Sequence, residues 1–224
     1  MIRRKSINRT ILAVGAAAVL VGGTLAWFTS TDTVTNKFKA GGNGTDTTTT
    51  GVEIWEKFDS EGAGKILPGK TINKDVQVQN TATYNSLIRV KLTPDIKSGE
   101  STEEKLAKIN LIFGDNVIKK DESIEGNTNV EWLQGTDGYY YYLGNVAPNG
   151  YTTRLLDDVQ LDPTAGNEFK DVTFDVVVDA ESIQSDNGAY ADAWKGAGQP
   201  VLDKLAIVAG QTAGTASQIP GAGK

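Results

Sequence analysis

The sequence predicts an all-β protein: an antiparallel, jelly-roll-like β-sandwich with one short helix, an N-terminal extended arm and a flexible C-terminal tail. Three observations support this prediction. Short segments in which apolar and polar residues alternate recur through the middle of the chain. Turn signals separate these segments at regular spacing, which is typical of a β-sandwich. Segments rich in glycine, threonine or alanine lie on either side of this region.

Residues 1–26 are typical of a cleaved export signal. A basic start is followed by the apolar run Ile11–Val21, and the small residues Thr24 and Ala26 then occupy positions −3 and −1 of a cleavage site before Trp27. An uncleaved membrane anchor is the alternative, because a span needs roughly 20 residues and the uncharged stretch is long enough. The high content of alanine, glycine and threonine favours cleavage, since these residues gain little from lipid.

Residues 27–50 are predicted to form an arm and a linker. Along Trp27–Ala40, threonines and lysines take alternate positions, as in a strand with one buried face. The apolar positions of that face are Phe28, Val34, Phe38 and Ala40. The following Gly41–Thr50 has nothing to bury and is typical of a linker. A strand tethered in this way is awkward within one domain but suits the sheet of a neighbouring molecule.

Residues 51–195 are predicted to form the sandwich. The capping box Ser101-x-x-Glu104 predicts its short helix, over Ser101–Lys108. The Asp-Gly pair before Tyr139 indicates a hairpin turn. The predicted strands are Val52–Phe58, Ile72–Asn80, Leu87–Leu92, Ile109–Phe113, Asn116–Lys119, Val130–Gln134, Tyr139–Leu143, Thr153–Leu161 and Val172–Val178.

Residues 196–224 are predicted to be a flexible tail. This segment is rich in glycine, alanine and glutamine, with one apolar patch at Val201–Val208. Such a composition buries too little apolar surface to offset the loss of chain entropy.

The composition excludes several classes of function. The chain has no cysteine and no histidine, so disulfide scaffolds, thiol nucleophiles, histidine-dependent triads and the usual zinc sites are excluded. A net charge of −6 argues against a broad nucleic-acid-binding surface. Ser–Lys dyads, paired carboxylates and metal-bound water remain, but no motif is arranged for them. We therefore predict no catalytic residue, no cofactor and no metal ligand, while calcium binding by the strand-end acids stays open.

Each of two further features can be explained either by ordinary packing and composition or by a specific function. The run Tyr139–Tyr142 would split between the two faces of a strand as packing residues, or would form a carbohydrate-binding strip. Extracellular β-sandwich pilins also form Lys–Asn isopeptide bonds that a buried acid promotes. This chain has many residues of these types, and only a tertiary structure can show a buried triplet.

Three stretches of the chain resemble a known family. Gly22–Gly41, GGTLAWFTSTDTVTNKFKAG, resembles the signal and mature N-terminus of proteins that SipW-type signal peptidases process. Ile66–Leu92, ILPGKTINKDVQVQNTATYNSLIRVKL, resembles the first β-hairpin region of the TasA, camelysin (CalY) and BsaA biofilm matrix proteins, and is most similar to the BsaA-type members. Ala180–Gly196 resembles their C-terminal pattern. The resemblance does not extend to Asp115–Tyr142 or to the tail.

The resemblance implies a secreted structural protein of the extracellular matrix or cell surface. Its partners would be further copies of itself in a fibre, a SipW-type signal peptidase and accessory matrix proteins, with membrane contact only during export. The mature N-terminal strand, with Phe28, Val34, Phe38 and Ala40, would insert into the next subunit. The alternatives are a monomeric adhesive or carbohydrate-binding module, and a camelysin-like metalloprotease, which the absence of histidine disfavours.

Overall fold

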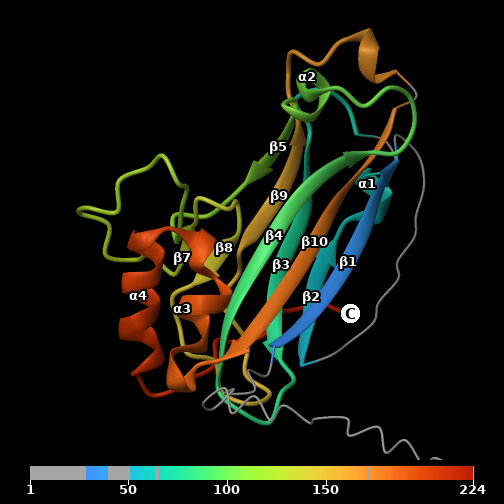
Figure 1. The fold of residues 1–224 in the computed structure, drawn as a ribbon. Coiled ribbons are helices and arrows are strands. Elements are labelled where there is room, and N and C mark those ends of the chain that lie inside the picture. The colour runs from blue at the N-terminus through green and yellow to red at the C-terminus, as the bar shows by residue number, and fades with distance from the viewer. Residues whose placement is uncertain (1–28, 40–50, 64–65, 171, 224) are drawn as a thin grey trace, which may run out of the picture.

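Two packed β-sheets form the body of the molecule (Figure 1). The computed structural model describes the backbone of residues 29–39 and all of residues 51–63, 66–170 and 172–223. Among these residues, the larger sheet has six strands in the order β1-β10-β4-β8-β7-β6, and the smaller has four in the order β2-β3-β9-β5. The strand pairs are antiparallel except β6 with β7. The prediction of an all-β sandwich is confirmed.

The strands match most of the predicted segments. They are β1 (Thr29–Lys39), β2 (Val52–Phe58), β3 (Thr71–Asn80), β4 (Ser86–Ile96), β5 (Ile109–Ile112), β6 (Val117–Ile118), β7 (Trp132–Gln134), β8 (Tyr140–Tyr142), β9 (Leu156–Leu161) and β10 (Thr173–Gln184). Two of them, β4 and β10, run further than predicted because they pair with each other from Ser86 to Ile96. Pro94 is tolerated within β4 because β8 pairs only with Arg89 and Val90, so β4 has no second neighbour there.

The main hydrophobic core lies between the two sheets. Alternate residues of each long strand point inward, as the period of two requires. On β10 these are Phe174, Val176, Val178 and Ala180, none of them more than 1% exposed. On β3 they include Ile72, Val76 and Val78, and on β2 Val52 and Ile54.

A second core lies on the outer face of the larger sheet, under helices α3 (Ala189–Ala193) and α4 (Gln199–Ala209). Figure 1 shows both helices, in orange and red, beside β7 and β8. Val201, Leu205 and Val208 of α4 are buried at helical spacing. They share this core with Leu87, Tyr141, Ile183 and Trp194 of the sheet and of the segment before the helix.

The expectation of a flexible tail over residues 196–224 is therefore wrong. After α4 the chain continues to form backbone hydrogen bonds with the sandwich: Ala147 donates to Gly214, and Glu56 and Gly223 exchange two bonds of 2.9 and 2.8 Å. The buried Gln77 side chain also donates to the Ser217 carbonyl and accepts from the Ile219 amide. The average composition of the segment does not reveal this order. Three apolar residues at helical spacing and several backbone hydrogen bonds hold the segment against the sandwich.

The expectation of one short helix also needs correction. The described residues contain, besides α3 and α4, the single turns α1 (Ser60–Ala63) and α2 (Glu103–Leu106) and short 3₁₀ turns at Asn167–Phe169, Asp186–Gly188 and Lys195–Ala197. Thr102, not Ser101, caps α2, because its hydroxyl accepts from the Lys105 amide. Across the described ranges, none of the helices has the length and apolarity that a membrane crossing requires.

Docking of α4 predicts a sharp difference between two of its apolar residues. Leu205 is 0% exposed and Ile207 is 62% exposed on the same helix. Leu205→Ala should lower the free energy of unfolding by about 2–5 kcal/mol because it leaves a cavity in the second core. Ile207→Ala should change it by no more than about 0.5 kcal/mol. Urea denaturation of both variants measures this, and equal effects would show that α4 is not packed.

Candidate functional site

The strongest candidate site is the sheet edge that β1 occupies. β1 runs antiparallel to β10 in one uninterrupted register, from Thr29 opposite Ile183 to Lys39 opposite Thr173. Figure 1 shows β1, in blue, as the outermost strand of its sheet and next to β10. All eleven residues of β1 thus pair with a single strand, and the long strand β10 becomes internal to the sheet.

The register aligns the predicted insertion residues with the inward row of β10. Val34 is opposite Val178, and Phe38 is opposite Phe174. Val178 and Phe174 of β10 belong to the main core. Phe28 and Ala40 lie outside the described residues, as do Thr24, Ala26 and Trp27 of the predicted cleavage site. Without β1, the backbone edge of β10 would lose its pairing strand, and a long apolar edge strand favours pairing with another chain.

The outer face of β10 is held by ion pairs instead. Arg89 of β4 donates to Glu181 through Nε and Nη2 at 2.9 and 2.6 Å. Its guanidinium also stacks on Tyr139 at 3.9 Å from the ring centroid and donates to the Tyr141 hydroxyl at 3.1 Å. Such a two-pronged, stacked arrangement suits arginine in particular. It fixes β10 to β4 independently of β1.

The tyrosine run is part of this packing. Tyr140 and Tyr141 are 6% and 0% exposed. Tyr140 packs on Phe113 in the main core, and Tyr141 packs on Trp194 in the second core. The predicted split between two faces is confirmed, and burial of the central pair is unfavourable for an exposed sugar-binding strip. The pKa of Tyr140 is raised to about 12, with desolvation as the first cause.

A buried ionisable pair lies in the main core close to the β1 edge. The Nζ of Lys74 on β3 is 2.6 Å from Oε1 of Glu56 on β2, and the two side chains are 0% and 8% exposed. Glu56 follows Ile54 along the inward row of β2, and Lys74 precedes Val76 along that of β3. The Phe58 ring lies with its centroid 5.3 Å from the amine.

Burial changes the protonation chemistry of this pair. Desolvation raises the pKa of Glu56 and lowers the pKa of Lys74, and in both cases it outweighs the attraction of the partner. Each shift disfavours the charged form of its group, although the charge of Asp175 on β10 also acts to raise the pKa of Lys74. Sequence analysis missed these two residues, although each occupies an inward position in an alternating pattern where an apolar residue is expected.

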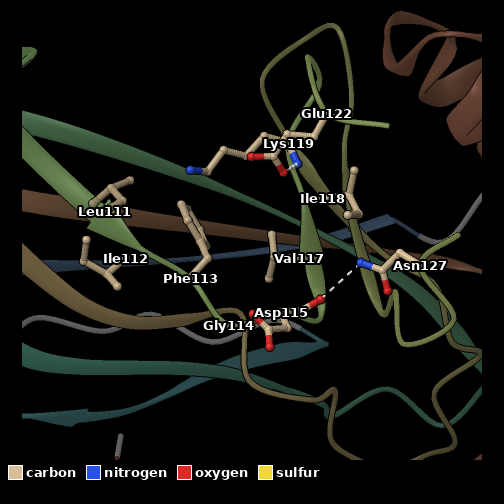
Figure 2. Close-up of a pocket in the computed structure, with 10 residues that line it drawn as sticks. All are labelled: Leu111, Ile112, Phe113, Gly114, Asp115, Val117, Ile118, Lys119, Glu122 and Asn127. Atoms are coloured by element: carbon tan, nitrogen blue, oxygen red, sulfur yellow. Dashed lines mark hydrogen bonds between the residues drawn. The ribbon is translucent and has the colours of Figure 1, made fainter. Parts of the chain in front are cut away.

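One surface hollow is less informative than the β1 edge. It is an open depression of about 460 Å³ between β5 and β6, the strands at the far edges of the two sheets. Figure 2 shows that the Glu122 carboxylate accepts from the Lys119 amide, while the Lys119 amine extends toward Phe113. Both contacts are therefore with other residues that line the same hollow. Nor do the described residues gather three or more acidic side chains into a cluster that would hold a metal ion.

Comparison of the chain with protein-family models, with curated proteins and with solved structures finds no match.

Because β1 pairs with β10, removal of β1 should speed the hydrogen exchange of backbone amides in β10. In a chain that starts at Gly42, the backbone amides of β10 that face β1 lose their acceptors. These amides within Thr173–Ile183 should exchange at least about tenfold faster than in the chain that starts at Trp27. Leu156–Leu161 of β9, in the opposite sheet, is the internal control and should keep its rate. Equal protection of β10 in both chains would contradict the pairing.

Proposed function

We propose that the protein is a secreted structural subunit of an extracellular biofilm-matrix fibre, which polymerises when the mature N-terminal strand inserts into a neighbouring subunit. The observation that carries this proposal is the continuous eleven-residue pairing of β1 with β10 at a sheet edge. Backbone pairing of this length supplies affinity, and the inward positions supply specificity.

Chain connectivity supports exchange of this strand between copies. Residues 40–51 join β1 in one sheet to β2 in the other. A connection of this length reaches at most about 3.3–3.6 Å per residue, or roughly 40 Å, which lets β1 leave its own edge for that of an adjacent copy. The same contacts then form between molecules, as in domain swapping.

The contact would propagate without closing. The donor surface is β1 and the acceptor surface is the edge of β10, so the two partners present different faces and each subunit keeps one of each. Heterologous contacts of this kind generate open filaments. The resemblance to the TasA, camelysin and BsaA proteins supports the same role, with cleavage before Trp27 by a SipW-type peptidase releasing the arm. The role requires no catalytic chemistry.

Filament formation should depend on the arm. Purified protein that starts at Trp27 should form filaments visible by negative-stain electron microscopy, and protein that starts at Gly42 should not. Both should be examined over a range of concentrations and at low pH. Filaments from both chains would remove β1 from the mechanism, and filaments from neither would favour the monomeric binding module.

A peptide should replace the arm. Synthetic Trp27–Gly41, added to protein that starts at Gly42, should bind and restore slow hydrogen exchange in β10. A matched peptide with Val34→Asp and Phe38→Asp should bind at least about tenfold more weakly, because two carboxylates opposite an apolar row lose their hydration. Isothermal titration calorimetry compares the two peptides. Equal affinity would show that the inward positions carry no specificity.

A further inference from the structure

We propose that the C-terminal segment, residues 211–223, blocks the edge of β2 and thereby directs the arm to the edge of β10. This role rests on the proposed function, because β1 is taken as the strand that moves between copies. It adds the reason why such a strand pairs with one of two neighbouring sheet edges and not with the other.

Two strand edges lie on the same side of the sandwich. β2 is the end strand of the smaller sheet, and β10 would be the end strand of the larger sheet if β1 left it. Both β1 and β10 contact β2 across the sandwich, and Figure 1 shows β1 and β2 next to each other. An extended arm offers the same backbone donors and acceptors to either edge. Backbone pairing alone therefore does not choose between β10 and β2.

The C-terminal segment occupies the β2 edge at Glu56. The Glu56 amide donates to the Gly223 carbonyl at 2.9 Å, and the Glu56 carbonyl accepts from the Gly223 amide at 2.8 Å. In an antiparallel ladder, a residue that exchanges both bonds with one neighbour makes none with the neighbour on its other side. A strand that approached this edge of β2 would need the same amide and carbonyl of Glu56. It cannot pair there while Gly223 holds both groups.

The segment covers this edge without creating another. Pro220 has no backbone N–H to offer to a further strand. Gly221 has a positive φ of 78°, and the Ala222 amide donates back to the Ile219 carbonyl at 3.1 Å, so the chain turns here instead of extending along β2. Prolines and covering loops are common means by which proteins prevent edge-to-edge association of sheets. The turn therefore ends the smaller sheet at β2.

The segment is fastened to the sandwich away from the edge that it covers. Gln77 of β3 is 1% exposed, and its Nε2 donates to the carbonyls of Thr152 and Ser217, both at 2.8 Å. Its Oε1 accepts from the Ile219 amide at 2.9 Å. Release of the segment would leave this buried carboxamide with one of its three hydrogen bonds, which is unfavourable. Further hydrogen bonds join Asn145 to Gln211, Asn145 and Ala147 to Gly214, and Tyr151 to Thr215 and Ala216. An incoming strand competes for none of these contacts.

Hydrogen exchange at Glu56 tests the contact. A chain that starts at Trp27 and ends at Gln218 keeps Ser217 but lacks the covering turn. Its Glu56 amide should exchange at least about tenfold faster than in the chain that ends at Lys224. Leu156–Leu161 of β9 should keep its rate in both chains, which shows that the sandwich stays folded. An unchanged rate at Glu56 would overturn the proposal.

The arm is the probe for the uncovered edge. In the shortened chain β10 is already paired with β1, so β2 is the edge that is newly open to a synthetic Trp27–Gly41 peptide. The peptide should slow exchange at Glu56 in the shortened chain and leave it unchanged in the chain that ends at Lys224. If Glu56 stays fast in the shortened chain with the peptide present, β2 does not accept the arm, and the proposal is wrong.

Gln77→Ala and Gln79→Ala form a matched pair in the full mature chain. The two glutamines are two places apart on β3. The Gln79 side chain bonds to Trp55 and to the Asn149 carbonyl, and within the described ranges it makes no hydrogen bond with residues 211–223. Gln77→Ala should speed exchange at Glu56 at least about fivefold, because it removes two bonds to the segment, and Gln79→Ala should not. Equal rates in the two variants would contradict fastening through Gln77.

The blocking role and the fibre role fail separately. If the chain that starts at Trp27 forms no filaments, the fibre role fails, while exchange at Glu56 with and without the peptide still decides what residues 211–223 do. If filaments form but loss of residues 219–224 leaves exchange at Glu56 unchanged, the blocking role alone fails. If both hold, the shortened chain should form branched filaments, because its arms have two edges to pair with, and unbranched filaments would count against blocking.

Discussion

The fold depends on the need of β10 for a neighbour on each side. β10 is the longest strand among the described residues, and its inward row supplies part of the main core. β4 satisfies one edge along eleven paired positions, and β1 satisfies the other along eleven more. A strand of this length and apolarity is stable within a sheet and prone to association at its edge. The pairing of β1 therefore decides whether β10 is an internal strand or an exposed edge of the sheet.

On the same side of the sandwich, the edge of the smaller sheet is covered in a different way. β2 is an edge strand too, but the C-terminal segment reaches it, and Gly223 exchanges two backbone hydrogen bonds with Glu56. Figure 1 shows the C-terminal end beside β2. A part of the chain thus covers the β2 edge with a short, local contact, while the β10 edge is covered by a whole strand joined through residues 40–51.

The buried Lys74–Glu56 pair places two ionisable side chains among the apolar residues of the main core. An ion pair in an apolar interior gains little net stability, because desolvation consumes most of the attraction. The same desolvation raises the pKa of Glu56 and lowers the pKa of Lys74.

The local pattern of the sequence determined the strands, since the period of two in segments such as Val52–Phe58 and Ile72–Asn80 requires one buried and one exposed face. It also predicted the strand character of the arm and the division of the tyrosine run between two faces. Contacts between distant parts of the chain decided the rest. Residues 196–224 fold because Leu205 and its neighbours meet Tyr141 and Ile183, which no local composition reveals. Lys74 and Glu56 meet because β2 and β3 pair. Alternation states which face a residue takes, whereas only the tertiary structure states what lies opposite that face.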